Sequence, residues 1–434
     1  MKKQRRYSAK RRTPSRRWHI PPPLIHGPET LEGGGILQEW GNELGVVLWQ
    51  ASRDVMLWAT TEPESRAEIF ASCGSPSASA AARDFSESSD SRFRNGLRTL
   101  RQMVEQPVTV RDEQVARACR QISEWADDQG RLGTALAFAQ DAALAAGHDA
   151  AAAFWVATVA VRLNDHARAE VWFRRAVGLA RQSRDWRMYS RSFGGLGNLY
   201  IRRGNLPDAR RLHTRALRGA RRGGMRREQA AALHDLFAVA VETGCAAEAE
   251  RLARQALDVY GTRNRRVHVL AHDVAYFWME QGHFGRALPV FQAVLPLIER
   301  PIERLFVLAD IARAAGGIGD ATTANSAAAE VWTSASETEL QPGAARALLE
   351  VARGELSLRS LAAAEAAARK SLELATQHRE SKIRFAAEAL LESLSEDVEQ
   401  TVPSHRSPEP TDQGGDELAA EFVRTLEVIA GAAE

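Results

Sequence analysis

Cysteine is scarce in this sequence, and its scarcity excludes two kinds of site. Only three cysteines occur in 434 residues, and Cys73, Cys119 and Cys245 lie far apart. They show none of the paired spacings of a zinc or redox motif. We therefore expect no disulfide framework and no cysteine metal site, and we predict a protein of the reducing cytoplasm.

Long hydrophobic runs are missing as well. The longest apolar run, Ala150 to Val161, is shorter than the ~18 residues that a membrane span requires. Three successive prolines, Pro21 to Pro23, stand where a signal peptide would need its apolar core. The sequence therefore predicts a cytoplasmic protein without a membrane partner.

Strand-like segments rich in Val, Ile, Thr and Tyr are nearly absent. The good helix formers Ala, Arg, Leu and Glu dominate the sequence instead. Hydrophobic residues make up 44% and charged residues 26%, which are ordinary values for a soluble globular protein, so we predict an all-α fold.

The motifs of common enzymes are absent too. There is no phosphate-binding glycine loop of the P-loop type, no nucleophile elbow and no H-E-x-x-H motif. The glycines at 33–35 precede a predicted helix but follow no strand, so a phosphate cradle is not expected. We predict no catalytic residue, no cofactor and no metal ion, and the sequence favours a binding protein over an enzyme.

Charge is segregated along the chain, although its net value is only +2. Residues 1–17 carry nine Lys or Arg and no acid, and residues 162–227 carry eighteen Arg against four acids. Residues 392–434 carry eleven acids against two Arg. Such basic segments favour an acidic partner, either a phosphate backbone, an acidic peptide or the acidic tail of the chain itself. The alternative is that the arginines are simply solvated.

Residues 193–200 read F-G-G-L-G-N-L-Y, and Ala209 and His213 follow. The pattern resembles the tetratricopeptide repeat, whose first helix reads W-x-x-L-G-x-x-Y and whose second helix reads A-x-x-x-F. Phe193 and His213 replace its two aromatic positions, while Gly197 and Ala209 are small where the paired helices approach. The resemblance implies a right-handed superhelical solenoid of antiparallel helix pairs, in which the first helices line a ligand groove.

The same frame recurs along the chain. The residues expected where the second helix of each pair crosses the first are Ala135, Ala169, Ala209, Ala249, Ala287, Ala321 and Ala364. The glycines expected in the turns are Gly130, Gly204, Gly244, Gly282 and Gly316. We predict seven units over about residues 113–380. Units of about 40 residues are similar to those of bacterial peptide-sensing regulators, which implies a regulatory role.

Composition divides the remainder of the chain. We predict a basic disordered arm over 1–33, an amphipathic helical segment over 34–70, a linker over 71–91, the solenoid with its capping helix over 92–397, a Pro-rich linker over 398–415 and a short acidic helix over 416–434. An apolar stripe from Trp40 to Trp58 predicts a single helix of about six turns that ends near Pro63. This helix packs on the solenoid or joins two copies of the chain as a homo-oligomer.

The repeat register also predicts which residues face the groove. They are Arg191, Asn198, Arg202, His234, Asp235, His272, Asp273, Tyr276, Asp310 and Arg313. His234-Asp235 and His272-Asp273 occupy the same positions in successive units, which predicts a ladder across the groove. The ladder has three interpretations: it binds the Lys or Arg groups of a peptide, it joins neighbouring units structurally, or it holds zinc. Asn198 stands where related repeats place an asparagine that clamps a ligand backbone.

Taken together, the sequence predicts a cytoplasmic adaptor or regulatory sensor that binds a protein or an extended peptide. The alternative is a regulator that binds nucleic acid through the basic arm and the Arg-rich second and third repeats. A third hypothesis is self-inhibition, in which the acidic C-terminal helix docks on those basic repeats until a partner displaces it.

Overall fold

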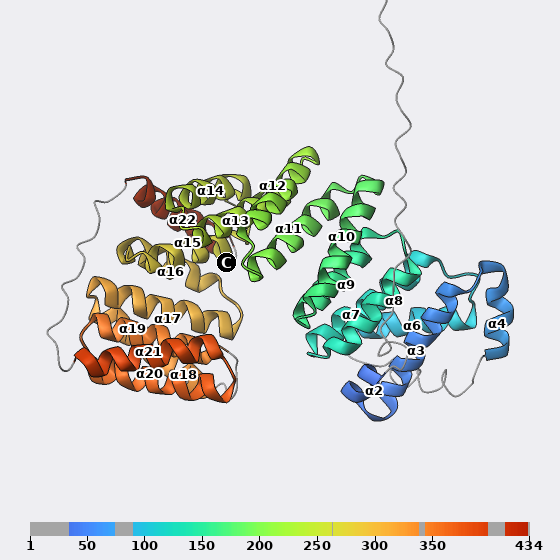
Figure 1. Cartoon of the computed structure of the whole chain (residues 1–434), viewed down its shortest axis with the longest axis horizontal. Helices are drawn as coiled ribbons and strands as arrows, with labels where there is room; N and C mark the ends of the chain where they lie inside the picture. Colours follow the sequence, from blue (N-terminus) through green and yellow to red (C-terminus); the bar gives the residue numbers. More distant parts are fainter. Residues whose placement is uncertain (1–33, 74–89, 263, 338–342, 398–412, 433–434) are drawn as a thin grey trace, which may run out of the picture. The chain divides into compact units, whose positions relative to one another are not determined.

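The computed structural model describes residues 34–73, 90–262, 264–337, 343–397 and 413–432 (Figure 1). The arm predicted over 1–33 and most of the linkers predicted over 71–91 and 398–415 lie outside these residues. Every regular element of the described segments is a helix, which confirms the all-α prediction. No described helix is long and apolar enough to cross a bilayer.

The chain folds into two compact units, residues 1–228 and residues 229–434. We call them the N-terminal and the C-terminal unit and describe each by itself. The division falls near the start of helix α13 (Arg226–Glu242), so the solenoid predicted over 92–397 is shared between the two units.

The N-terminal unit contains three complete helix pairs. Its elements are α2 (Gly34–Trp40), α3 (Asn42–Thr60), η1 (Pro63–Ser65), α4 (Arg66–Cys73), α6 (Ser91–Glu105), α7 (Asp112–Asp128), α8 (Leu132–Ala145), α9 (Ala150–Arg162), α10 (His166–Ser183), α11 (Trp186–Arg202) and α12 (Leu206–Arg222). Within the pairs, α7 packs on α8, α9 on α10 and α11 on α12. These pairs are the repeating elements that the sequence predicts.

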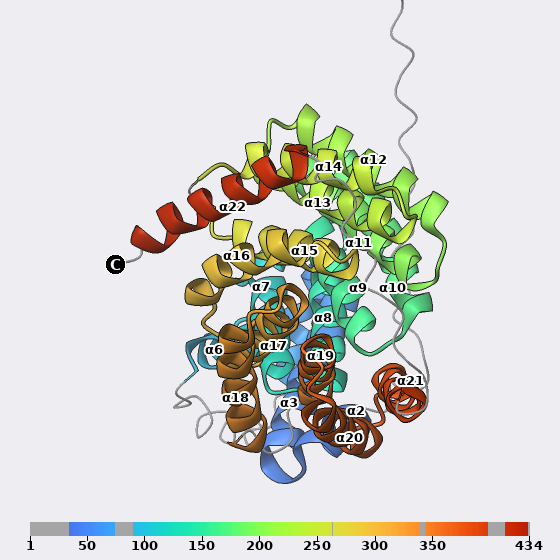
Figure 2. The same ribbon diagram turned by 90° about the vertical axis from the view of Figure 1, so that its left-hand side faces the viewer.

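The C-terminal unit continues with the same kind of element (Figure 2). Its helices are α13, α14 (Ala246–Tyr260), α15 (Val267–Glu280), α16 (Phe284–Val294), η3 (Leu295–Leu297), α17 (Pro301–Ile318), α18 (Ala321–Glu337), α19 (Ala344–Ser357), α20 (Leu361–Gln377), α21 (Ser381–Asp397) and α22 (Gln413–Gly431). α15 packs on α16, α17 on α18 and α19 on α20, and α21 covers α20 and α19.

The repeat motif works by close approach between helices. Ala209 and His213 of α12 are fully buried against α11. A methyl group added at Gly197 of α11 would overlap the His213 ring, so only glycine leaves room for the imidazole that stands in place of the usual aromatic.

One repeat was predicted in the wrong register. Ala321 is exposed at the start of α18, whereas Ala324 is 2% exposed and takes the crossing position. The turn glycine is likewise Gly319, with φ +81°, and not Gly316. Gly316 instead lies inside α17, where its Cα faces the Gly354 backbone of α19 so closely that a methyl group would overlap it. Gly316 packs against α19 and Gly319 forms the turn. Because the two glycines lie only three residues apart, the sequence pattern does not distinguish them.

The Trp40–Trp58 stripe forms two helices, not one. Gly41 has φ +47°, a left-handed backbone that separates α2 from α3. Trp40 stacks on Trp125 of α7 with ring centroids 4.6 Å apart, and the Trp58 indole donates a hydrogen bond of 2.9 Å to the Pro107 carbonyl. The stripe therefore packs within its own chain, and nothing in this packing supports a homo-oligomer through Trp40 and Trp58.

The acidic C-terminal helix also differs from its prediction. It begins at Gln413, before the predicted start at residue 416, and it runs to Gly431 as α22. It packs on α14, α15 and α16 of the C-terminal unit. The hypothesis that it docks on the Arg-rich second and third repeats, which are α9 to α12, is therefore wrong.

Candidate functional site

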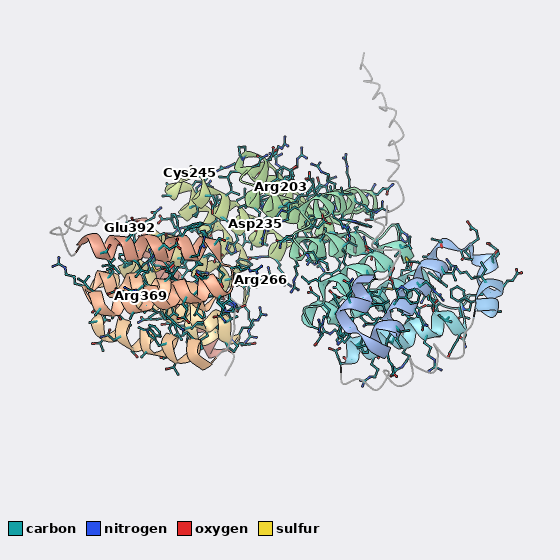
Figure 3. The ribbon with its side chains drawn as sticks, turned by 60° about the horizontal axis from the view of Figure 1, so that its bottom comes forward. Arg203, Asp235, Cys245, Arg266, Arg369 and Glu392 are labelled. Carbon is teal, nitrogen blue, oxygen red and sulfur yellow. The ribbon has the colours of Figure 1, made fainter. Side chains whose placement is uncertain are left out.

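The corrected register reveals an acidic column on the first helices of the C-terminal unit. One carboxylate lies fourteen residues before the buried alanine of each of four successive repeats, in the pairs Asp235/Ala249, Asp273/Ala287, Asp310/Ala324 and Glu350/Ala364. Figure 3 labels Asp235 on α13. We call the side of α13, α15, α17 and α19 that carries the acidic column the first-helix face.

The predicted His–Asp ladder crosses this face. His234 Nε2 of α13 lies 2.8 Å from Asp273 Oδ2 of α15, and His272 Nε2 of α15 lies 3.0 Å from Asp310 Oδ2 of α17. His272 Nδ1 also lies 3.3 Å from Asp273 Oδ1. Each histidine thus contacts the aspartate of the following repeat, as the structural interpretation of the ladder requires.

The ladder carries charge at neutral pH. Burial alone would lower the pKa of His272, but hydrogen bonds to Asp273 and Asp310 outweigh it and raise the pKa to about 9. Burial opposes ionisation of Asp273, yet the contacts with His234 and His272 hold its pKa well below the usual range. His272 is therefore a partly buried imidazolium that donates both of its N–H groups to carboxylates.

A second charged group continues the row towards α19. The Arg313 guanidinium of α17 contacts Glu280 of α15 and donates to Glu350 Oε2 over 2.7 Å. Arg353 donates to the other Glu350 oxygen over 2.9 Å. Glu350 is only 3% exposed, and both of its oxygens are paired, as a buried carboxylate requires. These contacts join three successive first helices.

Tyr276 lies between the two charged groups. Its ring stacks on His272 with centroids 6.4 Å apart, and the Arg346 guanidinium of α19 lies 5.3 Å from the ring centroid. Burial, with the carboxylates of Glu350 and Glu280, raises the pKa of Tyr276 to about 12. The hydroxyl is therefore a neutral donor and acceptor beside an arginine.

Asp310 is the exception within this balanced network. The residue is 1% exposed, and its Oδ2 contacts His272. Its other oxygen, Oδ1, is buried and accepts no hydrogen bond from the described part of the chain. A buried acceptor without a donor costs about 1–3 kcal/mol, and a ligand donor that reached Asp310 Oδ1 would recover that cost.

The predicted site residues divide between the two units. Seven belong to the first-helix face: His234, Asp235, His272, Asp273, Tyr276, Asp310 and Arg313. Arg191, Asn198 and Arg202 lie exposed on α11 of the N-terminal unit, where the Arg191 guanidinium lies 4.8 Å from the Phe154 ring centroid. Arg346 was not predicted, because its contact with Tyr276 joins helices two repeats apart. Glu350 is not among the predicted site residues, although the repeat register of the sequence places it on the same row in the seventh unit.

Some arginines of the basic segment 162–227 form ion pairs within the N-terminal unit. Glu170 of α10 pairs with Arg174 at 2.7 Å and with Arg203 at 2.6 Å, and its pKa falls to about 2 mainly through the hydrogen bond with Arg174. Figure 3 labels Arg203 after α11. Other arginines of this segment stay exposed along α12, at positions Arg211, Arg215, Arg218 and Arg222.

The zinc interpretation of the ladder finds no geometric basis. Within the described ranges, no three or more His, Cys, Asp or Glu side chains are grouped so that they could hold a metal ion.

Comparison with known proteins supports the repeat assignment. Residues 149–222 match the family model described as tetratricopeptide repeat. Among curated proteins none matches the sequence.

Three solved structures are similar to this chain at low sequence identity and with TM-scores below 0.5. BtubC (BKLC) from P. vanneervenii is 17% identical, with 54% of this chain and 94% of that chain covered and a TM-score of 0.40. The Rap protein complexed with competence and sporulation factor is 11% identical, with 81% and 99% covered and a TM-score of 0.41. The signal-transduction ATPase PH0952 with a tetratricopeptide repeat sensor, from Pyrococcus horikoshii, is 13% identical, with a TM-score of 0.49. This chain covers 53% of the length of PH0952, and 74% of this chain is matched.

The family match spans α9 to α12, two helix pairs of the kind found through both units. The residues of the motif, Gly197 and Ala209, lie where these paired helices approach most closely. The chain therefore contains tetratricopeptide repeats over residues 149–222, and its other helix pairs have the same form.

Proposed function

We propose that the protein is a scaffold that binds an extended segment of another protein on its first-helix face. The observation that carries this proposal is the acidic column of Asp235, Asp273, Asp310 and Glu350 on four successive helices. A row with the period of the repeats suits an extended ligand that runs along successive helices.

The ligand that fits best carries a Lys or Arg side chain. Asp310 is a buried carboxylate with an unused acceptor, and a cationic donor gives it both a hydrogen bond and a charge partner. The Tyr276 hydroxyl and the Arg346 guanidinium lie nearby and suit the polar groups of a peptide backbone. Asp273 and Glu350 already contact cationic side chains, so Asp310 is the acid that we assign to the ligand.

This role is that of an adaptor or regulatory sensor in the cytoplasm, and not of an enzyme. The charged groups of the first-helix face are neutralised in pairs and triads, which stabilises helix stacking. None of them is arranged as a nucleophile with an adjacent base. The proposal therefore rests on recognition alone.

A peptide library displayed against the full-length chain tests the proposal. We expect enriched peptides that contain a basic residue, and we expect them to lose at least tenfold in affinity on the Tyr276→Ala and Arg346→Ala variants. Val171→Ala is the matched control, because Val171 is 63% exposed on α10 of the other unit. Peptides that bind all three variants alike would place the binding surface elsewhere.

A second candidate function is binding of a polyanion such as nucleic acid. Exposed arginines spaced by four and three residues, Arg211, Arg215, Arg218 and Arg222, follow one side of α12 and favour it. Such binding would weaken steeply as salt is raised. Retention of nucleic acid by the full-length chain at low salt, with loss on Arg215→Gln/Arg218→Gln, would support this candidate.

A further inference from the structure

The C-terminal helix α22 is not the next element of the repeat array. α21 already covers the last pair, because it packs on α20 and α19. Fifteen residues, 398–412, then separate α21 from α22, and α22 packs on α14, α15 and α16 (Figure 2). The array is therefore closed without α22, and α22 covers helices two and three repeats before the last pair.

An apolar seam holds α22 in place. The buried residues of the helix recur at helical spacing and are Leu418, Ala419, Phe422, Leu426 and Ile429, each at most 6% exposed. Val428, on the opposite side, is 55% exposed. This pattern is that of an amphipathic helix whose apolar side packs on its own chain.

Two arginines hold the first turns of α22. Arg286 of α16 donates to Asp416 Oδ1 over 2.6 Å, and it is only 7% exposed. Arg254 of α14 donates to the Gly414 carbonyl over 2.8 Å and lies 3.3 Å from Glu421. Asp416 and Glu421 of α22 thus each contact an arginine of the surface that α22 covers.

Backbone fit at the start of α22 is equally specific. A methyl group at Gly415 would overlap the Arg286 guanidinium, so a larger residue here would displace that side chain from its contact with Asp416. Beneath Arg286, Glu250 of α14 lies 3.7 Å from its Nη1 and accepts a hydrogen bond of 2.7 Å from the Trp278 indole. The surface beneath α22 therefore has a hydrogen-bonded polar region at the start of the helix and an apolar region along the rest of it.

We infer that the surface of α14, α15 and α16 beneath α22 is a second binding site of the protein, and that it accepts an amphipathic helix with acidic first turns from a partner protein. α22 is its resident occupant. The site lies apart from the first-helix face, and the inference does not rest on the function proposed for that face.

Two features favour exchange of the occupant. Asp416 and Glu421 keep 48% and 34% of their side chains exposed, so solvent and salt weaken the contacts that hold the first turns. The tether keeps α22 on the same chain at an effective concentration on the order of mM, which a partner helix must overcome. A partner helix must therefore bind tightly enough to displace α22.

The test uses a fluorescently labelled peptide of residues 413–431 and the full-length chain. Wild type should bind the peptide weakly, because its own α22 competes. The Phe422→Ala/Leu426→Ala chain should bind the same peptide at least tenfold tighter, and adding Arg286→Gln should remove that gain. Val428→Ala is the control that should behave as wild type, and a peptide with both alanines should not bind.

A second version of the test avoids altering α22. A protease site placed within residues 398–412 allows the tether to be cut in the folded chain. After cleavage the labelled peptide should exchange into the site and bind at least tenfold tighter than before. A cleaved chain that keeps its helical content but excludes the peptide would overturn the inference. A wild-type dimer that exchanges α22 between copies would overturn the assignment of α22 as the resident occupant in its own chain.

Discussion

His272 Nε2 lies 3.0 Å from Oδ2 of Asp310, a carboxylate that is 1% exposed. This contact joins α15 to α17 and depends on the proton of the imidazole. The pKa of His272 is raised to about 9, above the value of about 6.5 for an unperturbed histidine. The contact therefore stabilises the folded chain below pH about 6.5, and its contribution is lost as pH rises towards 9.

We accordingly expect thermal stability of the C-terminal unit to fall between pH 7 and about 9.5, and His272→Gln to flatten that part of the profile. Differential scanning calorimetry at a series of pH values measures both chains. His148→Gln, an exposed histidine of the N-terminal unit, is the control. If the melting temperature of His272→Gln depends on pH as that of wild type does, the contact does not contribute to stability.

A buried acid in the N-terminal unit gives a pH dependence of the same sign at lower pH. Asp141 of α8 is 2% exposed, and burial raises its pKa to about 8 despite a hydrogen bond with Ser52 of α3. Because the folded pKa lies above the unfolded one, stability falls as pH rises from about 4 to about 8, by up to about 1.4 kcal/mol per unit. The stability of the Asp141→Asn variant should therefore increase relative to that of wild type as pH is raised through this range. Denaturant melts at pH 5 and pH 8 measure the change, with Glu43→Gln on the exposed side of α3 as control.

How far the sequence predicts this fold depends on the range of each contact. The helix pairs were predictable because Gly197 and Ala209 act within one pair, and their spacing is visible in the sequence. The register slip at Ala321 arose because Gly316, used for packing on α19, resembles a turn glycine, while the actual turn uses Gly319.

Longer-range contacts left no comparable signal. Amphipathic spacing predicted the apolar sides of α3 and α22 but could not say which surfaces they cover. The break at Gly41 was hidden because the apolar spacing continues across it. In the candidate site, repetition predicted His234 with Asp273, whereas Arg346 reaches Tyr276 from two repeats away, and no periodic pattern marks such a pair.

The approach of Gly197 to His213 gives a test of the repeat packing. Gly197→Ala places a methyl group against the buried imidazole, and we expect a loss of about 1–3 kcal/mol in the free energy of unfolding. Gly285→Ala makes the same change at an exposed helical position with open space around it, and it should gain about 0.5–1 kcal/mol. Urea titrations compare the two. If His213→Ala fails to restore the stability of Gly197→Ala, the overlap is not the cause.

Asp310 gives the sharpest test of ligand chemistry on the first-helix face. Asp310→Asn keeps the volume of the side chain but removes the charge, so a bound peptide should lose at least tenfold in affinity if its basic residue contacts Oδ1. The same substitution weakens the contact with His272, so the loss of affinity alone does not identify its cause.

A double-mutant cycle identifies the cause. In this cycle the basic residue of the peptide is replaced by norleucine, and the affinities are measured by calorimetry. We expect a coupling of about 1–3 kcal/mol between the two changes, since charge-assisted hydrogen bonds have that strength. Glu299→Gln, an acid 75% exposed after η3, should show none. If the two changes reduce the affinity additively, the cation of the ligand contacts another member of the acidic column.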